Sequence, residues 1–326
     1  MLAALALSFT AAIWSVTNYY AANVHRVRNV FPAIPEAERP AKQPGNGLTF
    51  LLVGLDRRSE VPTTGANAEG AVWKPGEQRS DSLMLVRITA DRSRVYVVSI
   101  PRDSWVPIPG HDLAKINAAF SYGGPTLLVR TVEKLTGIRI DHLAVIDWDG
   151  FRSLTDAVGG VTITIPEDTY DSARRRQWRS GTYTLPGDDA LDYVRQRYGL
   201  PNGDFDRVAR QQNFLRALMD KALQQETLTN PVRLTRMLGS VTDAVTVDDT
   251  LSNNDLRSLA LSLRHVRGGD VTFLTAPHAG LDRIRGQSVV LLDRDRTRAL
   301  WQAVRTDALP EYTARYGDSS LGTAVR

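Results

Sequence analysis

Apolar and polar positions along the chain predict one domain built from strands and helices. Three short runs rich in Leu, Val and Ile, at 49–55, 82–88 and 95–100, are typical of buried strands. Strands and helical patterns then follow one another without an internal repeat, which predicts an α/β/α sandwich with a central mixed β-sheet. The further strands expected are 142–146, 161–165, 271–275 and 288–292, and the expected helices are 113–122, 125–135, 151–158, 207–224 and 296–305.

The N-terminal segment is the longest uncharged stretch near a terminus. Residues 1–24 carry no charged side chain, and about 20 helical residues cross the hydrocarbon layer of a membrane. We therefore predict a single transmembrane signal anchor at 1–24; a cleaved signal peptide and a buried helix are the alternatives. Four prolines and two glycines in 25–47 predict a stiff juxtamembrane linker, so the globular domain is expected at 48–326.

Two later segments carry basic side chains that are expected to converge. Residues 190–197 are predicted to be extended, which would place Arg195 and Arg197 on one face. The predicted helix 207–224 carries Arg207, Arg210 and Gln211 in its first turns, at a helix N-terminus that favours anions.

Composition narrows the classes of partner and of site. The net charge of +4 and the pI near 9.4 favour an anionic partner such as a phospholipid surface, a phosphorylated polymer or nucleic acid. The chain has no cysteine, which excludes disulfides and thiolate sites. Its five histidines show no metal-ligand spacing, which argues against a zinc site.

Islands of arginine and aspartate follow several of the predicted strands. Guanidinium groups together with paired carboxylates suit a phosphate or diphosphate that carries a divalent metal. Asp56 closes the first strand and Asp81 opens the second, so both are candidate ligands of one cation. The alternative is that each caps a turn or pairs with a neighbouring arginine. The islands are Asp56-Arg57, Arg79-Ser80-Asp81-Ser82, Arg102-Asp103, Arg195-Gln196-Arg197 and Asp204-Phe205-Asp206-Arg207.

The pair after the third strand is the candidate for chemistry. Arg102 is placed to bridge two phosphates, and Asp103 is placed either to orient Arg102 or to receive a proton from an incoming hydroxyl. A purely structural contact between the two remains the alternative. Lys115 and Asn117 are weaker candidates, since a lysine on a helix is usually solvated.

Seven short motifs occur in one order: Leu52-Val53-Gly54-Leu55-Asp56, Arg79-Ser80-Asp81-Ser82, Ser99-Ile100-Pro101-Arg102-Asp103, Lys115-Ile116-Asn117-Ala118, Val158-Gly159-Gly160-Val161, Tyr193-Val194-Arg195-Gln196-Arg197 and Gly203-Asp204-Phe205-Asp206-Arg207 through Arg210-Gln211-Gln212. This order resembles the LytR-CpsA-Psr family of bacterial envelope proteins, strongly over 48–223 and loosely to about 312. Asp206 departs from the family pattern, in which a glycine is expected.

The resemblance implies a membrane-anchored enzyme whose catalytic domain lies outside the cytoplasm. Members transfer glycopolymers from a polyprenyl diphosphate carrier to peptidoglycan, with the polyprenyl tail in an apolar tunnel. The resemblance implies Mg²⁺, with Mn²⁺ as a substitute, held by Asp56 and Asp81. The arginine- and alanine-rich composition would fit an arabinogalactan or related polymer. The remaining site residues are Arg79, Arg102 and Asp103 for catalysis, Arg79, Arg102, Arg195, Arg197, Arg207, Gln211 and Lys115 for the diphosphate, and Asp204, Asn117 and Arg210 in support.

Other functions remain open on the residues alone. A polyprenyl diphosphate pyrophosphatase would use the same site with water as the nucleophile. A non-catalytic lipid-diphosphate-binding or regulatory protein would use it only for binding. A nucleic-acid partner is not expected, because we find no helix-turn-helix, zinc finger or RNA-binding signature.

Overall fold

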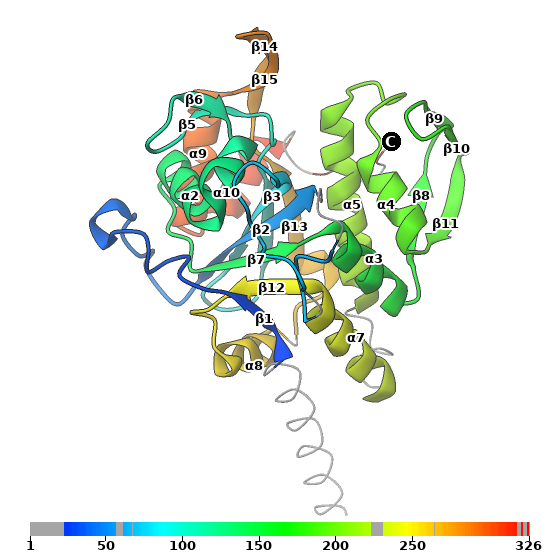
Figure 1. The fold of residues 1–326 in the computed structure, drawn as a ribbon, viewed down its shortest axis with the longest axis horizontal. Coiled ribbons are helices and arrows are strands. Elements are labelled where there is room, and N and C mark those ends of the chain that lie inside the picture. The colour runs from blue at the N-terminus through cyan, green and yellow to red at the C-terminus, as the bar shows by residue number, and fades with distance from the viewer. Residues whose placement is uncertain are drawn as a thin grey trace, which may run out of the picture.

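A seven-stranded mixed sheet forms the centre of the computed structural model, which describes residues 23–56, 61–66, 68–222, 231–263, 265–317, 321 and 325 (Figure 1). The strand order is β1-β12-β7-β2-β3-β4-β13, with β2 parallel to β7 and antiparallel to β3. The predicted central mixed sheet is therefore confirmed. The strands are β1 (His25–Val27), β2 (Leu48–Asp56), β3 (Arg79–Ile88), β4 (Val95–Ser99), β7 (His142–Ile146), β12 (Val245–Asp248) and β13 (Val271–Thr275).

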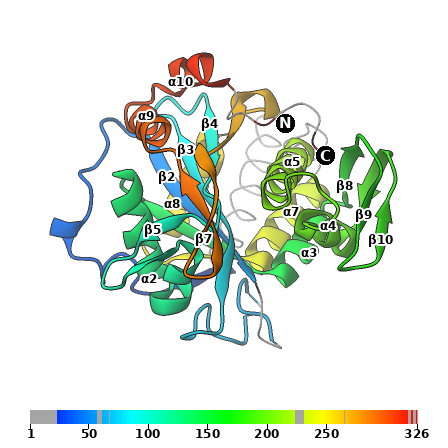
Figure 2. The same ribbon diagram turned by 90° about the horizontal axis from the view of Figure 1, so that it is seen from above.

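Helices cover both faces of this sheet (Figure 2). One face packs against α2 (Asn117–Thr136), α9 (Arg294–Arg305) and α10 (Leu309–Arg315). The other face packs against α3 (Trp148–Ala157), α5 (Asp204–Ala222) and α8 (Asn253–Ser262), while α4 (Gly187–Arg195) and α7 (Pro231–Ala244) lie against α3. The fold is thus the α/β/α sandwich that the sequence predicts.

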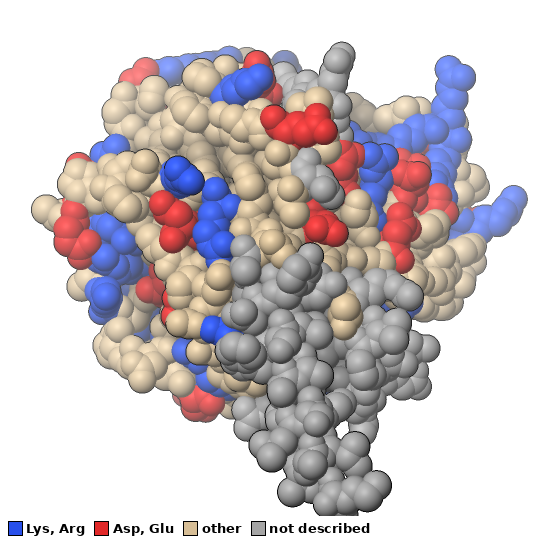
Figure 3. Space-filling view, turned by 60° about the horizontal axis from the view of Figure 1, so that its bottom comes forward, with Lys and Arg blue, Asp and Glu red and all other residues tan. Residues whose placement is uncertain are grey.

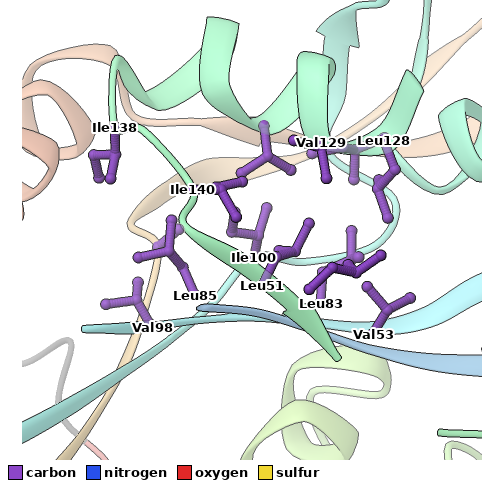
Figure 4. Packing of buried hydrophobic residues seen from close by; sticks show 14 of the residues in the cluster. Leu51, Val53, Leu83, Leu85, Val98, Ile100, Leu128, Val129, Ile138 and Ile140 are labelled. Carbon is purple, nitrogen blue, oxygen red and sulfur yellow. The ribbon is translucent and has the colours of Figure 1, made fainter. Parts of the chain in front are cut away.

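The core between the sheet and α2 shows why these strands form (Figure 4). Alternate residues point to one face of a strand, so Leu51 and Val53 of β2 lie beside Leu83 and Leu85 of β3 and face Leu128 of α2. All five side chains are at most 1% exposed. Burial of one such side chain contributes about 1.5–3 kcal/mol, so this layer fixes the register of β2 and β3.

Small paired strands lie outside the central sheet. The pair formed by β8 and β11 packs against α4 and α5 in a separate apolar cluster. The hairpin β14–β15 projects from the domain at the top of Figure 1. The bounds are β5 (Trp105–Pro107), β6 (Leu113–Lys115), β8 (Val161–Ile165), β9 (Thr169–Asp171), β10 (Arg176–Trp178), β11 (Gly181–Leu185), β14 (His278–Ile284) and β15 (Gln287–Leu292), with 3₁₀ helices η1 (Glu36–Glu38) and η2 (Gly268–Asp270).

The predicted helix 113–122 is wrong in its first part. Residues 113–115 form β6, because they pair with β5, and the helix begins at Asn117. The two helices predicted on either side of 123–124 are joined in α2 across a kink. Gly124 sits at that kink with φ +63°, and a Cβ there would lie 2.7 Å from the Trp73 ring, so the kink requires glycine.

The predicted linker 25–47 is also wrong, because these residues pack against the domain. β1 adds to the sheet edge beside β12, and Val30, Phe31 and Ile34 are buried in the core. Arg39 Nη2 lies 2.7 Å from Oε1 of the buried Glu133. The packed domain therefore begins well before residue 48.

Several predictions fall wholly or partly outside the described residues. Residues 1–22 of the anchor predicted at 1–24 lie outside the described residues. The helices that the structure describes include none long and apolar enough to cross a membrane. Arg57 and the end of the predicted helix 207–224 are likewise not described. Between β2 and β3, the described residue Thr63 packs against the domain, since its backbone N–H donates to Asp147 Oδ2 at 2.9 Å.

Candidate active site

The candidate site begins where β2 ends and β3 starts. Asp56 and Arg79 are directly paired across these antiparallel strands. The register then shifts, because Leu55 pairs with Ser80 and Gly54 with Ser82, and Asp81 is left as the extra residue of a β-bulge. Bulges re-aim side chains beside active sites. Asp56, Arg79 and Asp81 consequently line one cavity, which we call the polar cavity.

The polar cavity collects almost every residue that the sequence singles out. Its volume is about 1270 Å³. Seven basic and four acidic side chains line it, which leaves an excess of three positive charges. The predicted residues in its wall are Asp56, Arg79, Asp81, Arg102, Asp103, Lys115, Asn117, Arg195, Arg197, Asp204, Arg207 and Gln211.

Arg102 lies among three carboxylates. Its Nη1 donates to Asp81 Oδ1, and its other nitrogens lie 3.8 Å from Asp204 Oδ1 and 3.9 Å from Asp103 Oδ2. Burial alone would lower the pKa of Arg102, but the charges of Asp81, Asp204 and Asp103 outweigh that effect and raise it. Arg102 is therefore a fixed cation beside the bulge.

Asp103 joins this group to the start of α2. Its Oδ1 lies 3.3 Å from Lys115 Nζ, so Lys115 is directed into the cavity rather than freely solvated. The backbone N–H of Asn117 donates to the Arg102 carbonyl at 3.1 Å, which ties the helix N-terminus to the turn that carries Arg102 and Asp103.

The opposite wall comes from α4 and α5. Residues 190–195, predicted to be extended, belong to α4, and Arg195 is the last residue of that helix. Both predicted arginines still line the cavity. The Arg195 guanidinium lies 5.0 Å from the ring centre of Trp148, whose Nε1 donates to Asp56 Oδ1 at 3.4 Å. Arg197 Nη1 lies 3.9 Å from Asp204 Oδ1.

Arg207 is the most deeply buried cation of this wall. It is 4% exposed, and its Nη2 lies 2.9 Å from Asp204 Oδ1. This contact is an ion pair without the geometry of a hydrogen bond, and the Nε and Nη2 of Arg207 have no hydrogen-bond partner among the described residues. Burial and the nearby Arg102 lower the pKa of Arg207 to about 10. A buried guanidinium with open donors in a cavity wall is suited to an anion, because buried donors without partners are costly.

Arg210 does not belong to this group, contrary to the prediction. Its Nη1 donates to Gln196 Oε1 at 2.7 Å, and its guanidinium lies 4.5 Å from the ring centre of Tyr193. It is fully buried and outside the residues that line the polar cavity. Arg210 therefore supports the packing of α4 on α5 and does not reach the cavity.

An apolar cavity of about 230 Å³ adjoins the polar one, and we call it the apolar cavity. Trp148 and Gln211 line both, so the two are neighbours. It lies between the sheet and the helices α3 and α5, with walls that include Leu52, Met84, Phe151, Leu154, Phe214 and Leu218. An elongated ligand with a charged head and an apolar tail would fit the pair.

The chain matches a known protein family over most of its length. A model of the LytR_cpsA_psr family matches residues 18–306. The chain belongs to the LytR-CpsA-Psr family.

The chain is similar to proteins named for cell wall biosynthesis and for teichoic acid transfer. The chain is 34% identical to "Cell wall biosynthesis protein LcpA" of Corynebacterium glutamicum, over 80% of this chain and 56% of that protein. It is 31% identical to the "Polyisoprenyl-teichoic acid--peptidoglycan teichoic acid transferase TagU" of Bacillus mycoides, over 65% of this chain and 68% of that protein. The chain thus spans little more than half the length of the first of these relatives.

A solved member has the same fold. It is YwtF (TagT) of Bacillus subtilis with bound octaprenyl pyrophosphate lipid, which is 23% identical, with a TM-score of 0.60, over 83% of this chain and 96% of that one. At this identity the likeness establishes the fold alone.

Asp206, which replaces the glycine expected in LytR-CpsA-Psr members, has a structural role. Its carboxylate accepts hydrogen bonds from the backbone N–H of Asn202 at 2.9 Å and from Asn202 Nδ2 at 3.0 Å. These bonds hold the turn before α5, which carries Asp204 and Arg207.

The donor set fits a hard divalent cation without completing its coordination. Asp56 and Asp81 both line the polar cavity, but the described residues contain no group of three or more His, Cys, Asp or Glu that could hold a metal. One or two carboxylates, completed by phosphate oxygens and water, is the usual protein contribution to a Mg²⁺ site. Asp81 also binds Arg102, so a cation would share this carboxylate with the arginine.

Four residues that line the polar cavity were not predicted as site residues from the sequence: Trp148, Arg174, Tyr122 and Tyr198. A signal existed for Trp148. It follows β7, which is parallel to β2, and the carboxyl ends of parallel strands meet at one edge of a sheet.

Proposed function

We propose that this protein is a phosphotransferase that moves a polyprenyl-diphosphate-linked glycopolymer onto a sugar hydroxyl of peptidoglycan and so forms a phosphodiester link. The observation that carries the proposal is the junction of two cavities at Trp148 and Gln211. One cavity offers open guanidinium donors, and the other is apolar. The diphosphate would occupy the first and the start of the polyprenyl tail the second.

In this reaction the acceptor hydroxyl oxygen attacks the phosphorus that carries the glycopolymer. The new P–O bond forms as the bond from that phosphorus to the oxygen of polyprenyl phosphate breaks. Arg79, Arg102, Arg195, Arg197 and Arg207 would bind the diphosphate oxygens and stabilise the negative charge in the transition state.

The hydroxyl proton also requires an acceptor. Asp103 is the candidate, because it lines the polar cavity and Lys115 and Arg102 hold its carboxylate in place. Asp56 and Asp81 would hold Mg²⁺, for which Mn²⁺ could substitute. Bound there, the cation would neutralise charge on the phosphate oxygens.

We further propose that residues 1–24 anchor the protein in the cell membrane and that the catalytic domain lies outside the cytoplasm. Protease added to intact cells should then degrade the domain; protection until the membrane is broken would contradict this location. On the face in Figure 3, basic and acidic side chains of the described residues are interspersed, a pattern that does not favour a nucleic-acid partner there.

Mass spectrometry of lipid retained by the purified protein tests the substrate class. The proposal predicts a polyprenyl phosphate or diphosphate in the wild type and much less of it in Leu154→Trp, a substitution that adds bulk inside the apolar cavity. Leu261→Trp is the matched control, because Leu261 is 60% exposed and outside that cavity. Equal retention in all three proteins would contradict the assignment of the tail to this cavity.

A further inference from the structure

The polar cavity is larger than a diphosphate requires. Its volume of about 1270 Å³ exceeds the range of about 300–1,000 Å³ that is usual for small-molecule sites. Two strongly exposed aromatic residues belong to its wall: Tyr122 of α2 is 49% exposed, and Tyr198, between α4 and α5, is 54% exposed. Exposed rings beside a charged cavity offer apolar faces to a ligand that is itself polar.

Each of these rings lies beside another side chain. The Tyr122 ring packs against His111, with 4.8 Å between ring centres, and the Arg197 guanidinium lies 5.9 Å from the centre of the Tyr198 ring. An exposed ring that a neighbouring side chain restricts loses less side-chain entropy on binding than a free one. A pyranose suits such a surface, because its C–H face packs on an aromatic ring while its hydroxyls reach polar groups.

We infer that Tyr122 and Tyr198 are sugar-binding residues on the two walls of the polar cavity. This inference rests on the proposed function for the source of the sugars. Tyr198 lies beside Arg197, a diphosphate residue, so it should contact the first sugar of the donor. Tyr122 lies on α2, the helix that directly follows Lys115. Lys115 is paired with Asp103, the proposed proton acceptor, so Tyr122 should contact the acceptor sugar, whose hydroxyl loses a proton.

Two binding probes separate these sources. Chitohexaose, an uncharged oligomer of N-acetylglucosamine, stands for the acceptor. Geranyl diphosphate with and without attached N-acetylglucosamine stands for the donor, and the gain in affinity from the sugar is the quantity of interest. Tyr170→Ala is the matched control, because Tyr170 is 48% exposed and lies outside the cavity wall.

Tyr122→Ala should weaken chitohexaose binding about tenfold, and Tyr198→Ala should remove most of the gain from the donor sugar, while Tyr170→Ala changes neither. Wild-type affinities in both tyrosine variants, no sugar binding by the wild type, or the opposite pairing of variants and probes would overturn the inference. Chitohexaose lacks phosphate and lipid, so its binding does not depend on transfer. Absent transfer with the expected binding losses would refute the proposed function alone.

Discussion

Arg207 and Asp204 form an ion pair within the first turn of α5, with 2.9 Å between Nη2 and Oδ1, and Arg207 still has donors without a hydrogen-bond partner among the described residues. Asp204 is also shared, since Arg102 and Arg197 lie 3.8 and 3.9 Å from the same oxygen. The ion pair therefore positions Arg207 but leaves its Nε and Nη2 donors without hydrogen bonds, and an anion in the polar cavity would accept them.

Replacement of Arg207 should separate binding from stability. Arg207→Met should weaken diphosphate binding about 10- to 100-fold, since hydrogen bonds to charged groups contribute about 1.5–3 kcal/mol. Its free energy of unfolding without ligand should change by less than about 1 kcal/mol, because the variant removes a buried charge whose partner keeps two other arginines. Titration calorimetry and urea unfolding measure the two effects.

Arg179→Met is the control for Arg207→Met, because Arg179 is exposed and is not among the residues that line the polar cavity. Strong destabilisation of Arg207→Met with unchanged diphosphate affinity would mean that Arg207 is a structural residue.

Arg102→Ala should lower the rate of transfer about 10²- to 10³-fold, the usual effect of removing one preorganised donor to a transition state. Arg102→Lys should recover only part of the rate, because an ammonium cannot contact Asp81 and the diphosphate with the geometry of a guanidinium. Single-turnover rates measure this effect, and near-normal turnover by the alanine variant would refute the role.

Asp56→Asn should raise the Mg²⁺ concentration needed for half-maximal transfer. Asp56 is the cleaner test of the two proposed ligands, because its described contact is a hydrogen bond from Trp148, whereas Asp81 also holds Arg102. Asp112→Asn is the control, since Asp112 is 85% exposed and outside the cavity wall. An unchanged Mg²⁺ dependence in Asp56→Asn would exclude Asp56 as a ligand.

Asp248, at the end of β12, should make the free energy of unfolding depend on pH in the acid range. Burial would raise the pKa of Asp248, but hydrogen bonds from His142, Thr250 and the Leu143 backbone N–H outweigh it and lower the pKa. A carboxyl with a lowered folded-state pKa contributes stability above its unfolded value of 3.8, and this stability is lost as pH falls further. Asp248→Asn should lose about 1.5–3 kcal/mol near neutral pH and show a flatter loss of stability below pH 3.8.

Urea unfolding from pH 7 to pH 2.5 checks this prediction. Parallel stability curves for the wild type and Asp248→Asn would refute it.

Truncation tests the corrected domain boundary. A chain that starts at Leu48 loses Val30, Phe31 and Ile34 from the core, and burial of each contributes about 1.5–3 kcal/mol. It also leaves the buried Glu133 without Arg39. We expect it to be less stable than a chain that starts at Asn23 by about 5 kcal/mol, a large part of the stability of a typical domain. Equal melting temperatures would show that residues 25–47 are dispensable.

The sheet and most of the site could be predicted because both depend on local signals. Apolar runs identified β2, β3 and β4, and the charged islands follow or flank those strands. These charged residues then converge, because the end of β2 and the end of β4 lie at the edge of the sheet where the antiparallel strand β3 begins. Residues 190–197 were wrongly predicted to be extended, but the prediction that Arg195 and Arg197 line the site is still correct, because both reach the cavity from the end of α4.

The errors concern contacts between distant segments. Arg207 and Arg210 are three residues apart on one helix, but Gln196 and Tyr193 of another segment draw Arg210 away from the cavity. The prolines in residues 25–47 predicted an exposed linker. Local sequence does not show that β1 pairs with β12, which lies more than 200 residues later in the chain. Tyr122 and Tyr198 carry no local signal, because an exposed tyrosine looks the same on any surface.

The central claim is transfer of a phosphate-linked sugar, and the most direct measurement is the product formed from geranyl diphosphate N-acetylglucosamine, Mg²⁺ and an oligosaccharide acceptor. The account predicts an acceptor joined to N-acetylglucosamine through a phosphodiester, released together with one equivalent of geranyl phosphate. N-acetylglucosamine phosphate formed at the same rate with and without acceptor would indicate a hydrolase and would contradict it.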